Sequence, residues 1–282
     1  MKQINEIELV KSDESSGAKK YGGDVRHFTV HHDGVTIPVS RGGQGLPLVL
    51  CPGLASTQAD LQELAALLRR DYDVVTFDLR GHGLASPADT YSFKAFFSDL
   101  AAVVAHMGHL PSAPILVGYS LGADLAVHYA AEHPDSVAGL VLIDGANPVP
   151  EPFITQATLP DFRAMWEEMV SAQRAARGTA HQVLLTAQEI LEVNVEVDAV
   201  RSRILDWYGR IECPISLIIS TSMAGETGGS RAVRFNQNWA EGIARLVRER
   251  PGISPFWFDA DHRLIFTHAP EISQIIQSAH GS

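Results

Sequence analysis

The chain of 282 residues is 45% hydrophobic, so it can bury the full core of an α/β domain of ordinary size. Its formal net charge of -11 argues against a nucleic acid or an anionic membrane surface as a partner. Because the N-terminus has no apolar segment typical of a secretory signal and no stretch approaches the length of a membrane span, we expect a soluble cytoplasmic protein.

The first half of the chain alternates short apolar runs with segments of helical spacing. Residues 1–24 are polar and charged, which is typical of a flexible N-terminal arm. Asp33 and Gly34 separate two runs of strand-forming residues, so we expect a β-hairpin over residues 28–39. The pattern then predicts strands at 47–51, 74–77, 114–117 and 139–144, and helices at 58–70, 93–107 and 123–133.

The alternation breaks between residues 148 and 210, where apolar residues recur at helical spacing with no strand between them. It resumes with a strand at 215–220, a helix at 237–248, a strand at 255–258 and a final helix from about Pro270. This order predicts an α/β fold with a doubly wound, mostly parallel sheet, formed by residues 25–147 and 211–282. Residues 148–210 are predicted to form an inserted helical cap.

A serine lies between a predicted strand and a predicted helix in the pentapeptide Gly118-Tyr119-Ser120-Leu121-Gly122. The two glycines leave room for a sharp turn that projects the Ser120 hydroxyl beyond the end of the sheet, with a helix N-terminus behind it. The G-x-S-x-G pattern alone is a weak signal. The strand before it and the helix after it make it a strong indication of a nucleophilic serine.

Four segments together resemble the α/β-hydrolase family, from about Phe28 to the C-terminus. They are Pro52-Gly53-Leu54 after the third strand, Asp78-Leu79-Arg80-Gly81-His82-Gly83, the serine pentapeptide, and Asp261-His262 followed by Ala269-Pro270-Glu271. In this family the catalytic groups follow in the order serine, acid, histidine. The resemblance therefore implies that Ser120 is the nucleophile and that His262, after the last predicted strand, is its general base.

The resemblance also implies an oxyanion hole made of two backbone N–H groups. One belongs to Leu121, which follows the nucleophile. The other belongs to Leu54, although many members of the family have His-Gly where this chain has Pro52-Gly53. His82 and Arg80, in the turn after the fourth strand, are expected to have structural roles.

The acid that orients His262 is absent from the position where the family usually has it. That position, in the loop after the strand that follows the cap, corresponds to Met223, which cannot accept a hydrogen bond from a histidine. Asp144 ends the preceding strand, an alternative position that part of the family uses. We expect Asp144 to be the acid, with Glu226 as the second candidate; a loop-capping role is the alternative for Asp144 that involves no chemistry.

Aromatic residues of the predicted cap are either walls of an apolar pocket or the packing that a small helical domain needs. We take Trp166 and Trp207 as candidate substrate contacts, together with Tyr119 beside the nucleophile. The sequence thus predicts a small-molecule, mainly apolar substrate. No metal site and no disulfide are expected, because Cys51 and Cys213 are too few and too distant. No cofactor is expected either.

The predicted function is hydrolysis of a carboxylic ester, thioester or lactone through a serine acyl-enzyme. One alternative is a cofactor-free dioxygenase of the same fold that acts on a heteroaromatic substrate, although such enzymes carry histidine beside the serine where this chain has Tyr119 and Leu121. Another is a ligand-binding receptor derived from the fold. A carbon–carbon bond hydrolase is a third alternative, within the hydrolase class. The sequence does not indicate the natural substrate, the stereoselectivity or the oligomeric state.

Overall fold

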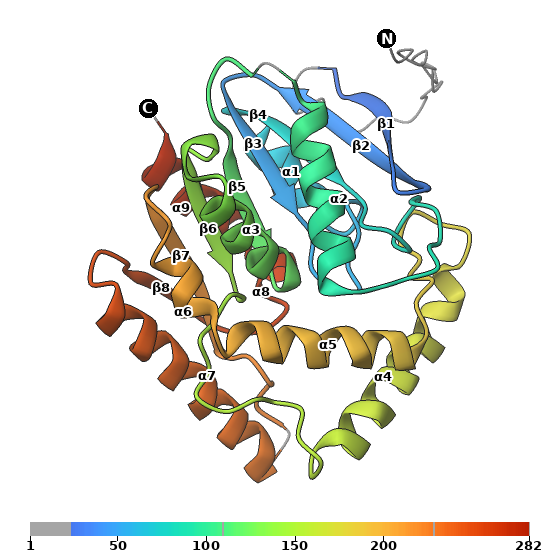
Figure 1. Ribbon diagram of the computed structural model, residues 1–282, viewed down its shortest axis with the longest axis vertical. Coiled ribbons are helices and arrows are strands. Elements are labelled where there is room, and N and C mark those ends of the chain that lie inside the picture. Colours follow the sequence, from blue (N-terminus) through green and yellow to red (C-terminus); the bar gives the residue numbers. More distant parts are fainter. Residues whose placement is uncertain (1–23, 109, 228, 282) are drawn as a thin grey trace.

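The computed structural model describes residues 24–108, 110–227 and 229–281, so residues 1–23 of the predicted N-terminal arm lie outside the described residues. An eight-stranded sheet forms the centre of the molecule, with the strand order β1-β2-β4-β3-β5-β6-β7-β8 (Figure 1). The strands are β1 (Arg26–His32), β2 (Val35–Gly43), β3 (Leu46–Cys51), β4 (Tyr72–Phe77), β5 (Ile115–Tyr119), β6 (Gly139–Ile143), β7 (Ile215–Ser222) and β8 (Pro255–Asp261).

The sheet is antiparallel where β2 pairs with β1 and β4, and parallel at every other pairing. The predicted hairpin is present, and its two central residues, Asp33 and Gly34, have φ of 49° and 75°, the positive values that a type I′ turn requires. Side chains of β3 alternate between the two faces: Leu48 belongs to one core cluster and Val49 to the other. The predicted doubly wound, mostly parallel α/β fold is confirmed.

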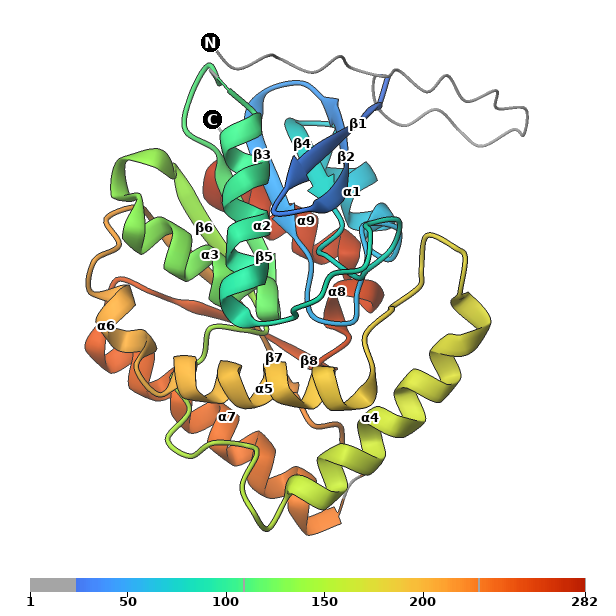
Figure 2. The same ribbon diagram turned by 45° about the vertical axis from the view of Figure 1, so that its right-hand side comes forward.

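Helices cover both faces of the sheet (Figure 2). The helices α1 (Gln62–Leu68), α8 (Leu264–Thr267) and α9 (Ala269–His280) bury apolar side chains in the cluster that contains Leu48. The helices α2 (Phe93–His106), α3 (Leu121–Glu132) and α7 (Gly229–Glu249) contribute to the cluster that contains Val49. A short 3-10 helix, η1 (Pro134–Ser136), follows α3.

Helix α1 is shorter than the helix predicted over residues 58–70. The Asp60 carboxylate accepts hydrogen bonds from the N–H and the hydroxyl of Thr57, both at 2.9 Å. The N–H of Gln58 donates to the Asp78 carboxylate at 2.8 Å. The N–H groups of Asp60 and Leu61 both donate to Thr57 O, at 3.1 and 3.3 Å, so residues 57–61 form hydrogen-bonded turns and the regular helix begins at Gln62.

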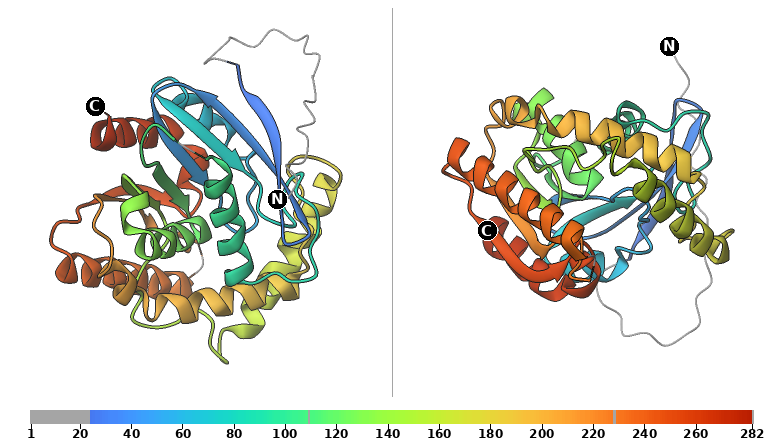
Figure 3. Two further views of the ribbon diagram at one scale, coloured as in Figure 1. Left: turned by 45° about the horizontal axis from the view of Figure 1, so that its top comes forward. Right: turned by 90° about the horizontal axis from the view of Figure 1, so that it is seen from below.

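Between β6 and β7 the chain leaves the sheet and forms α4 (Leu159–Gln173), the 3-10 helix η2 (Arg174–Ala176), α5 (Ala187–Arg201) and α6 (Ile204–Tyr208). We call residues 148–210 the inserted segment. A capping box of Thr186 and Glu189 starts α5. Together with α7, helices α4 and α5 lie across the end of the sheet at which its parallel strands finish (Figure 1 and Figure 3, right). The division into a core and a cap domain stays a prediction.

The contacts that hold the inserted segment to the rest of the protein include a backbone pairing and a buried ion pair. Near its middle, the N–H of Gly83 donates to Gln182 O and the N–H of Leu184 donates to Gly81 O, both at 2.8 Å. At the end of α5, Arg201 makes a two-pronged ion pair with Asp124 of α3, at 2.9 Å from Nε to Oδ1 and 2.7 Å from Nη2 to Oδ2. Both side chains of this pair are buried.

Among the helices of the described residues, none combines the length and the apolar character that a membrane span requires.

The buried Arg201–Asp124 pair is expected to matter for stability far more than an exposed pair of the same chemistry. Arg201→Met leaves the Asp124 carboxylate buried without its partner, so we expect the free energy of unfolding in urea to fall by about 3–5 kcal/mol. The matched control is Arg231→Met, which removes the half-exposed ion pair between Arg231 and Asp161 and is expected to cost no more than about 1 kcal/mol. Equal losses of unfolding free energy in the two variants would contradict the larger contribution of the buried pair to stability.

Candidate active site

Ser120 lies at the sharp turn between β5 and α3, where its backbone has a left-handed φ of 51° and a ψ of -119°. The turn is crowded on both sides. A Cβ on Gly118 would lie 2.3 Å from Gly122 O, and a Cβ on Gly122 would lie 2.3 Å from Cys51 O. Both positions therefore require glycine, and the resulting turn holds Ser120 at the carboxyl end of the sheet.

Ser120 is linked by hydrogen bonds to His262, after β8, and through it to Asp144, after β6. His262 Nε2 lies 3.0 Å from Ser120 Oγ, and His262 Nδ1 lies 2.8 Å from Asp144 Oδ2. Because a carboxylate only accepts hydrogen bonds, Nδ1 carries the donated proton and Nε2 is left to accept the Ser120 hydroxyl. Such an arrangement gives a serine a base, and gives the base an orienting acid.

Asp144 is fully buried and receives hydrogen bonds from two sources. Besides His262, Ser220 of β7 donates its backbone N–H to Asp144 Oδ1 at 2.9 Å, and its hydroxyl lies 2.7 Å from Oδ2. A buried carboxylate needs such donors because it has lost its hydration. Glu226, the second candidate acid, has an exposed side chain. Sequence reasoning missed Ser220; its place near the end of the strand beside β6 is the signal that points to it.

Tyr119 was predicted to contact the substrate, but its side chain packs against the loop of His262. Its hydroxyl donates to His262 O at 2.9 Å, and its ring stacks on the imidazole with 5.3 Å between ring centroids. Burial raises the pKa of Tyr119, so the phenol keeps the proton that it donates. Tyr119 is absent from the described residues that line the cavity, and the structure therefore corrects this prediction.

The loop after β3 lies directly against the Ser120 turn. A Cβ on Gly53 would come within 3.0 Å of Ser120 Cβ. Leu54 and Leu121, which carry the predicted oxyanion donors, line the same cavity as Ser120. Leu121 is the first residue of α3, a position whose N–H has no acceptor within the helix. The structure thus places both residues that carry the predicted donors beside Ser120.

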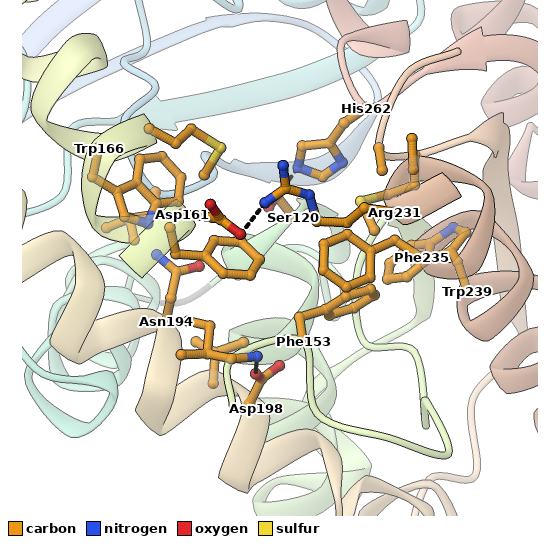
Figure 4. A pocket seen from close by; sticks show the side chains of 18 of the residues that line it. Ser120, Phe153, Asp161, Trp166, Asn194, Asp198, Arg231, Phe235, Trp239 and His262 are labelled. Carbon is orange, nitrogen blue, oxygen red and sulfur yellow. Dashed lines mark hydrogen bonds and ion pairs between the residues drawn. The ribbon is translucent and has the colours of Figure 1, made fainter. Parts of the chain in front are cut away.

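A cavity of about 670 Å³ opens in front of Ser120 and His262. Figure 4 shows that its walls come from α4, α5, α7 and the chain between β6 and α4. An ion pair between Asp161 of α4 and Arg231 of α7 crosses the cavity (Figure 4). Aromatic and methionine side chains supply much of the lining: Phe153, Phe162, Met165, Trp166, Met223, Phe235 and Trp239.

Trp166 thus lies in the wall of the cavity, but Trp207, the other predicted tryptophan, does not. The Trp207 ring packs against His128, with 4.4 Å between ring centroids, and under the Arg210 guanidinium at 4.8 Å. Neither His128 nor Arg210 is among the described residues that line the cavity. The structure corrects the predicted substrate contact of Trp207, which instead packs α6 against α3.

Sequence reasoning also missed the cavity residues of α7. The helix predicted from residue 237 excludes Arg231 and Phe235, whereas α7 begins at Gly229 and includes both. The signal was present as one apolar stripe at three- and four-residue spacing, formed by Ala232, Phe235, Trp239, Ile243 and Leu246.

No group of three or more histidine, cysteine or acidic side chains in the described part of the chain is placed to hold a metal ion. Cys51 is buried, Cys213 is partly buried, and both are free.

Comparison with known proteins assigns the family. A family model of the alpha/beta hydrolase fold matches residues 47–234, which is more than half of the chain. The chain belongs to the alpha/beta hydrolase fold family. The sn-1-specific diacylglycerol lipase ABHD11 of Xenopus laevis is 29% identical over 163 residues, 57% of this chain and 50% of that protein. The 2-(acetamidomethylene)succinate hydrolase of Mesorhizobium japonicum is 34% identical over 113 residues, 39% of each.

The alignments thus span half or less of the length of these two curated relatives, both of which are hydrolases. Among solved structures, E-2-(acetamidomethylene)succinate hydrolase matches this alpha/beta hydrolase with a TM-score of 0.69, over 92% of this chain and 100% of that one. With 21% sequence identity, that likeness concerns the fold alone.

The acid assignment predicts a difference between two variants of this alpha/beta hydrolase. Asp144→Asn keeps the shape of the side chain but no longer favours the Nδ1–H tautomer of His262, so we expect hydrolysis of an aryl ester to fall by about four orders of magnitude in kcat. Glu226→Gln is the matched control, and its kcat is expected to stay close to that of the wild type. The reverse ranking in steady-state assays would move the acid to Glu226.

Proposed function

We propose that the protein is a serine hydrolase that cleaves a carboxylic ester, thioester or lactone by way of a covalent acyl-enzyme. The observation that carries this proposal is the hydrogen-bonded chain from Ser120 through His262 to the buried Asp144, at distances of 3.0 and 2.8 Å. The nucleophile of this chain faces a mainly apolar cavity. The hydrolase activity of the relatives also supports it.

In the first half of the reaction, Ser120 Oγ attacks the substrate carbonyl carbon while His262 Nε2 takes the hydroxyl proton. Asp144 stabilises the imidazolium that forms. The carbonyl oxygen becomes an oxyanion, and the backbone N–H groups of Leu54 and Leu121 are the proposed donors to it. When the tetrahedral intermediate collapses, the bond to the leaving group breaks and His262 returns the proton to that group.

In the second half of the reaction, a water molecule occupies the position that the leaving group held in the first half. His262 removes a proton from the water as it attacks the acyl carbon, and the same N–H groups stabilise the second oxyanion. Collapse breaks the bond between the acyl group and Ser120 Oγ, to which His262 gives the proton. The products are a carboxylic acid and the restored enzyme.

The inserted segment is proposed to act as a cap that selects the substrate. It supplies Phe153, Phe162, Met165 and Trp166 to the cavity, while the nucleophile and its base come from the sheet domain. Burial of apolar area is worth about 25 cal/mol per Å², so aromatic and thioether walls favour a bulky apolar or aromatic acyl or alcohol group. In this proposal the inserted segment determines which substrates bind, and the sheet domain carries the groups that react with them.

The first prediction from this proposal concerns the nucleophile. Ser120→Ala is expected to lower kcat for an aryl ester by about 10⁶-fold, because binding and the oxyanion donors alone remain. A fluorophosphonate is expected to modify the wild type at Ser120, as peptide mass spectrometry would show, and to leave Ser120→Ala unmodified. Modification of another serine would contradict the assignment. Equal rates under nitrogen and in air would separate hydrolysis from the dioxygenase alternative.

The second prediction concerns specificity. Trp166→Ala removes a large ring from the cavity wall, so we expect the ratio of kcat/KM between a bulky aryl ester and an acetyl ester to change. Trp207→Ala is the matched control, because it removes the same side chain from a site away from the cavity. The control is expected to keep the wild-type ratio. A uniform slowing of every ester by Trp166→Ala would place the substrate pocket elsewhere.

A further inference from the structure

The loop that carries Leu54 has a strained backbone. Ala55, the next residue, has a φ of 61°, in the left-handed region that residues with a Cβ rarely adopt. The turn closes when both the N–H and the hydroxyl of Ser56 donate to Gly53 O, at 3.2 and 2.9 Å. Strained backbone of this kind persists only where its surroundings hold it in place.

The side chain that holds Ala55 is His82, which comes from the turn after β4. The N–H of Ala55 donates to His82 Nε2 at 3.1 Å. On the other side of the ring, His82 Nδ1 lies 2.9 Å from Arg80 O. The ring is fully buried and packs edge-on against Phe96, with 5.9 Å between ring centroids. Polar and apolar contacts thus fix its position on three sides.

These two hydrogen bonds leave His82 one tautomer. The Arg80 carbonyl only accepts, so Nδ1 carries the proton; the Ala55 N–H only donates, so Nε2 is the unprotonated acceptor. Burial lowers the pKa of His82 to about 4, which keeps the ring neutral at physiological pH. The imidazole therefore presents a permanent acceptor to the loop.

The neighbouring N–H, that of Leu54, has no partner among the described backbone groups. Fixing the amide of Ala55 also restricts the peptide unit before it, which carries the Leu54 N–H, because the two planar units meet at Leu54 Cα and are related only by the φ and ψ of Leu54. We infer that His82 is a positioning residue that sets the orientation of the Leu54 N–H toward the oxyanion at Ser120. This inference rests on the proposed serine hydrolase activity. His82 touches no substrate and acts through the loop alone.

Three substitutions of His82 distinguish the contribution of the Nε2 acceptor from that of the packing of the ring. His82→Asn keeps a donor near the place of Nδ1 but has no acceptor at the place of Nε2. His82→Phe preserves the ring and its contact with Phe96, and also lacks the acceptor. His82→Gln reaches the place of Nε2 with its amide oxygen, and is the conservative variant. The thermal unfolding midpoint of each is measured beside its kinetics.

We expect kcat for an aryl ester to fall by about 10- to 100-fold in His82→Asn and His82→Phe, with KM little changed. Outright removal of one oxyanion donor costs about 10²–10³-fold, and a displaced donor costs less. A trifluoromethyl ketone forms a hemiketal with Ser120 whose oxyanion occupies the same site, so its affinity should fall by the same factor. His82→Gln should recover most of both losses.

If the wild type hydrolyses the ester and binds the ketone, two results would overturn the role of His82 and leave the proposed function intact. One is wild-type kcat and ketone affinity in His82→Asn and His82→Phe. The other is a loss that follows the unfolding midpoints of the three variants regardless of the acceptor. A wild-type protein that neither hydrolyses the ester nor binds the ketone would instead overturn the proposed function.

Discussion

The site depends on strained backbone at the ends of three neighbouring strands. Five non-glycine residues of the described chain have positive φ, and four of them, Ala55, Ser120, Asp144 and Ala146, follow β3, β5 or β6. Each such residue costs about 1–3 kcal/mol, which the surrounding sheet must offset. Hydrogen bonds between strands supply part of the constraint, since the N–H of Ser120 donates to Ile143 O at 2.9 Å. The positive φ values turn the chain sharply at the ends of these strands, so that the side chains and N–H groups of these residues lie beyond the end of the sheet.

The position of the acid follows from what a buried carboxylate requires. At the end of β6, Asp144 lies beside β7, whose Ser220 contributes a backbone and a hydroxyl donor. These donors replace the water that burial removes, so the carboxylate stays available to His262. Among the described residues of the loop after β7, no side chain bonds to Ser120, His262 or Asp144. Met223 of this loop lines the cavity instead, and an apolar side chain there suits the remaining walls.

Local signals were sufficient to predict most of the fold, because strands were marked by apolar runs and the hairpin by Asp33-Gly34. The errors arose where side chains act at a distance. Tyr119, for example, donates its hydroxyl to His262 O, and His262 lies 143 residues further along the chain. Trp207 illustrates the limit for the site: composition shows that the inserted segment is rich in aromatic residues, but only the packing of α6 decides whether the Trp207 ring faces the cavity.

The turn at residues 81–83 contacts both the inserted segment and the loop after β3. Its backbone pairs with Gln182 and Leu184 of the inserted segment, while the His82 ring accepts from the loop after β3. The segment that lines the cavity and the loop that carries Leu54 therefore rest on the same support. A rigid support of this kind keeps the proposed oxyanion donors in place before substrate arrives, and preorganised donors stabilise a developing charge without the cost of reorienting when the reaction occurs. The contacts of residues 81–83 thus hold the wall of the cavity and the loop of Leu54 in a fixed position relative to each other.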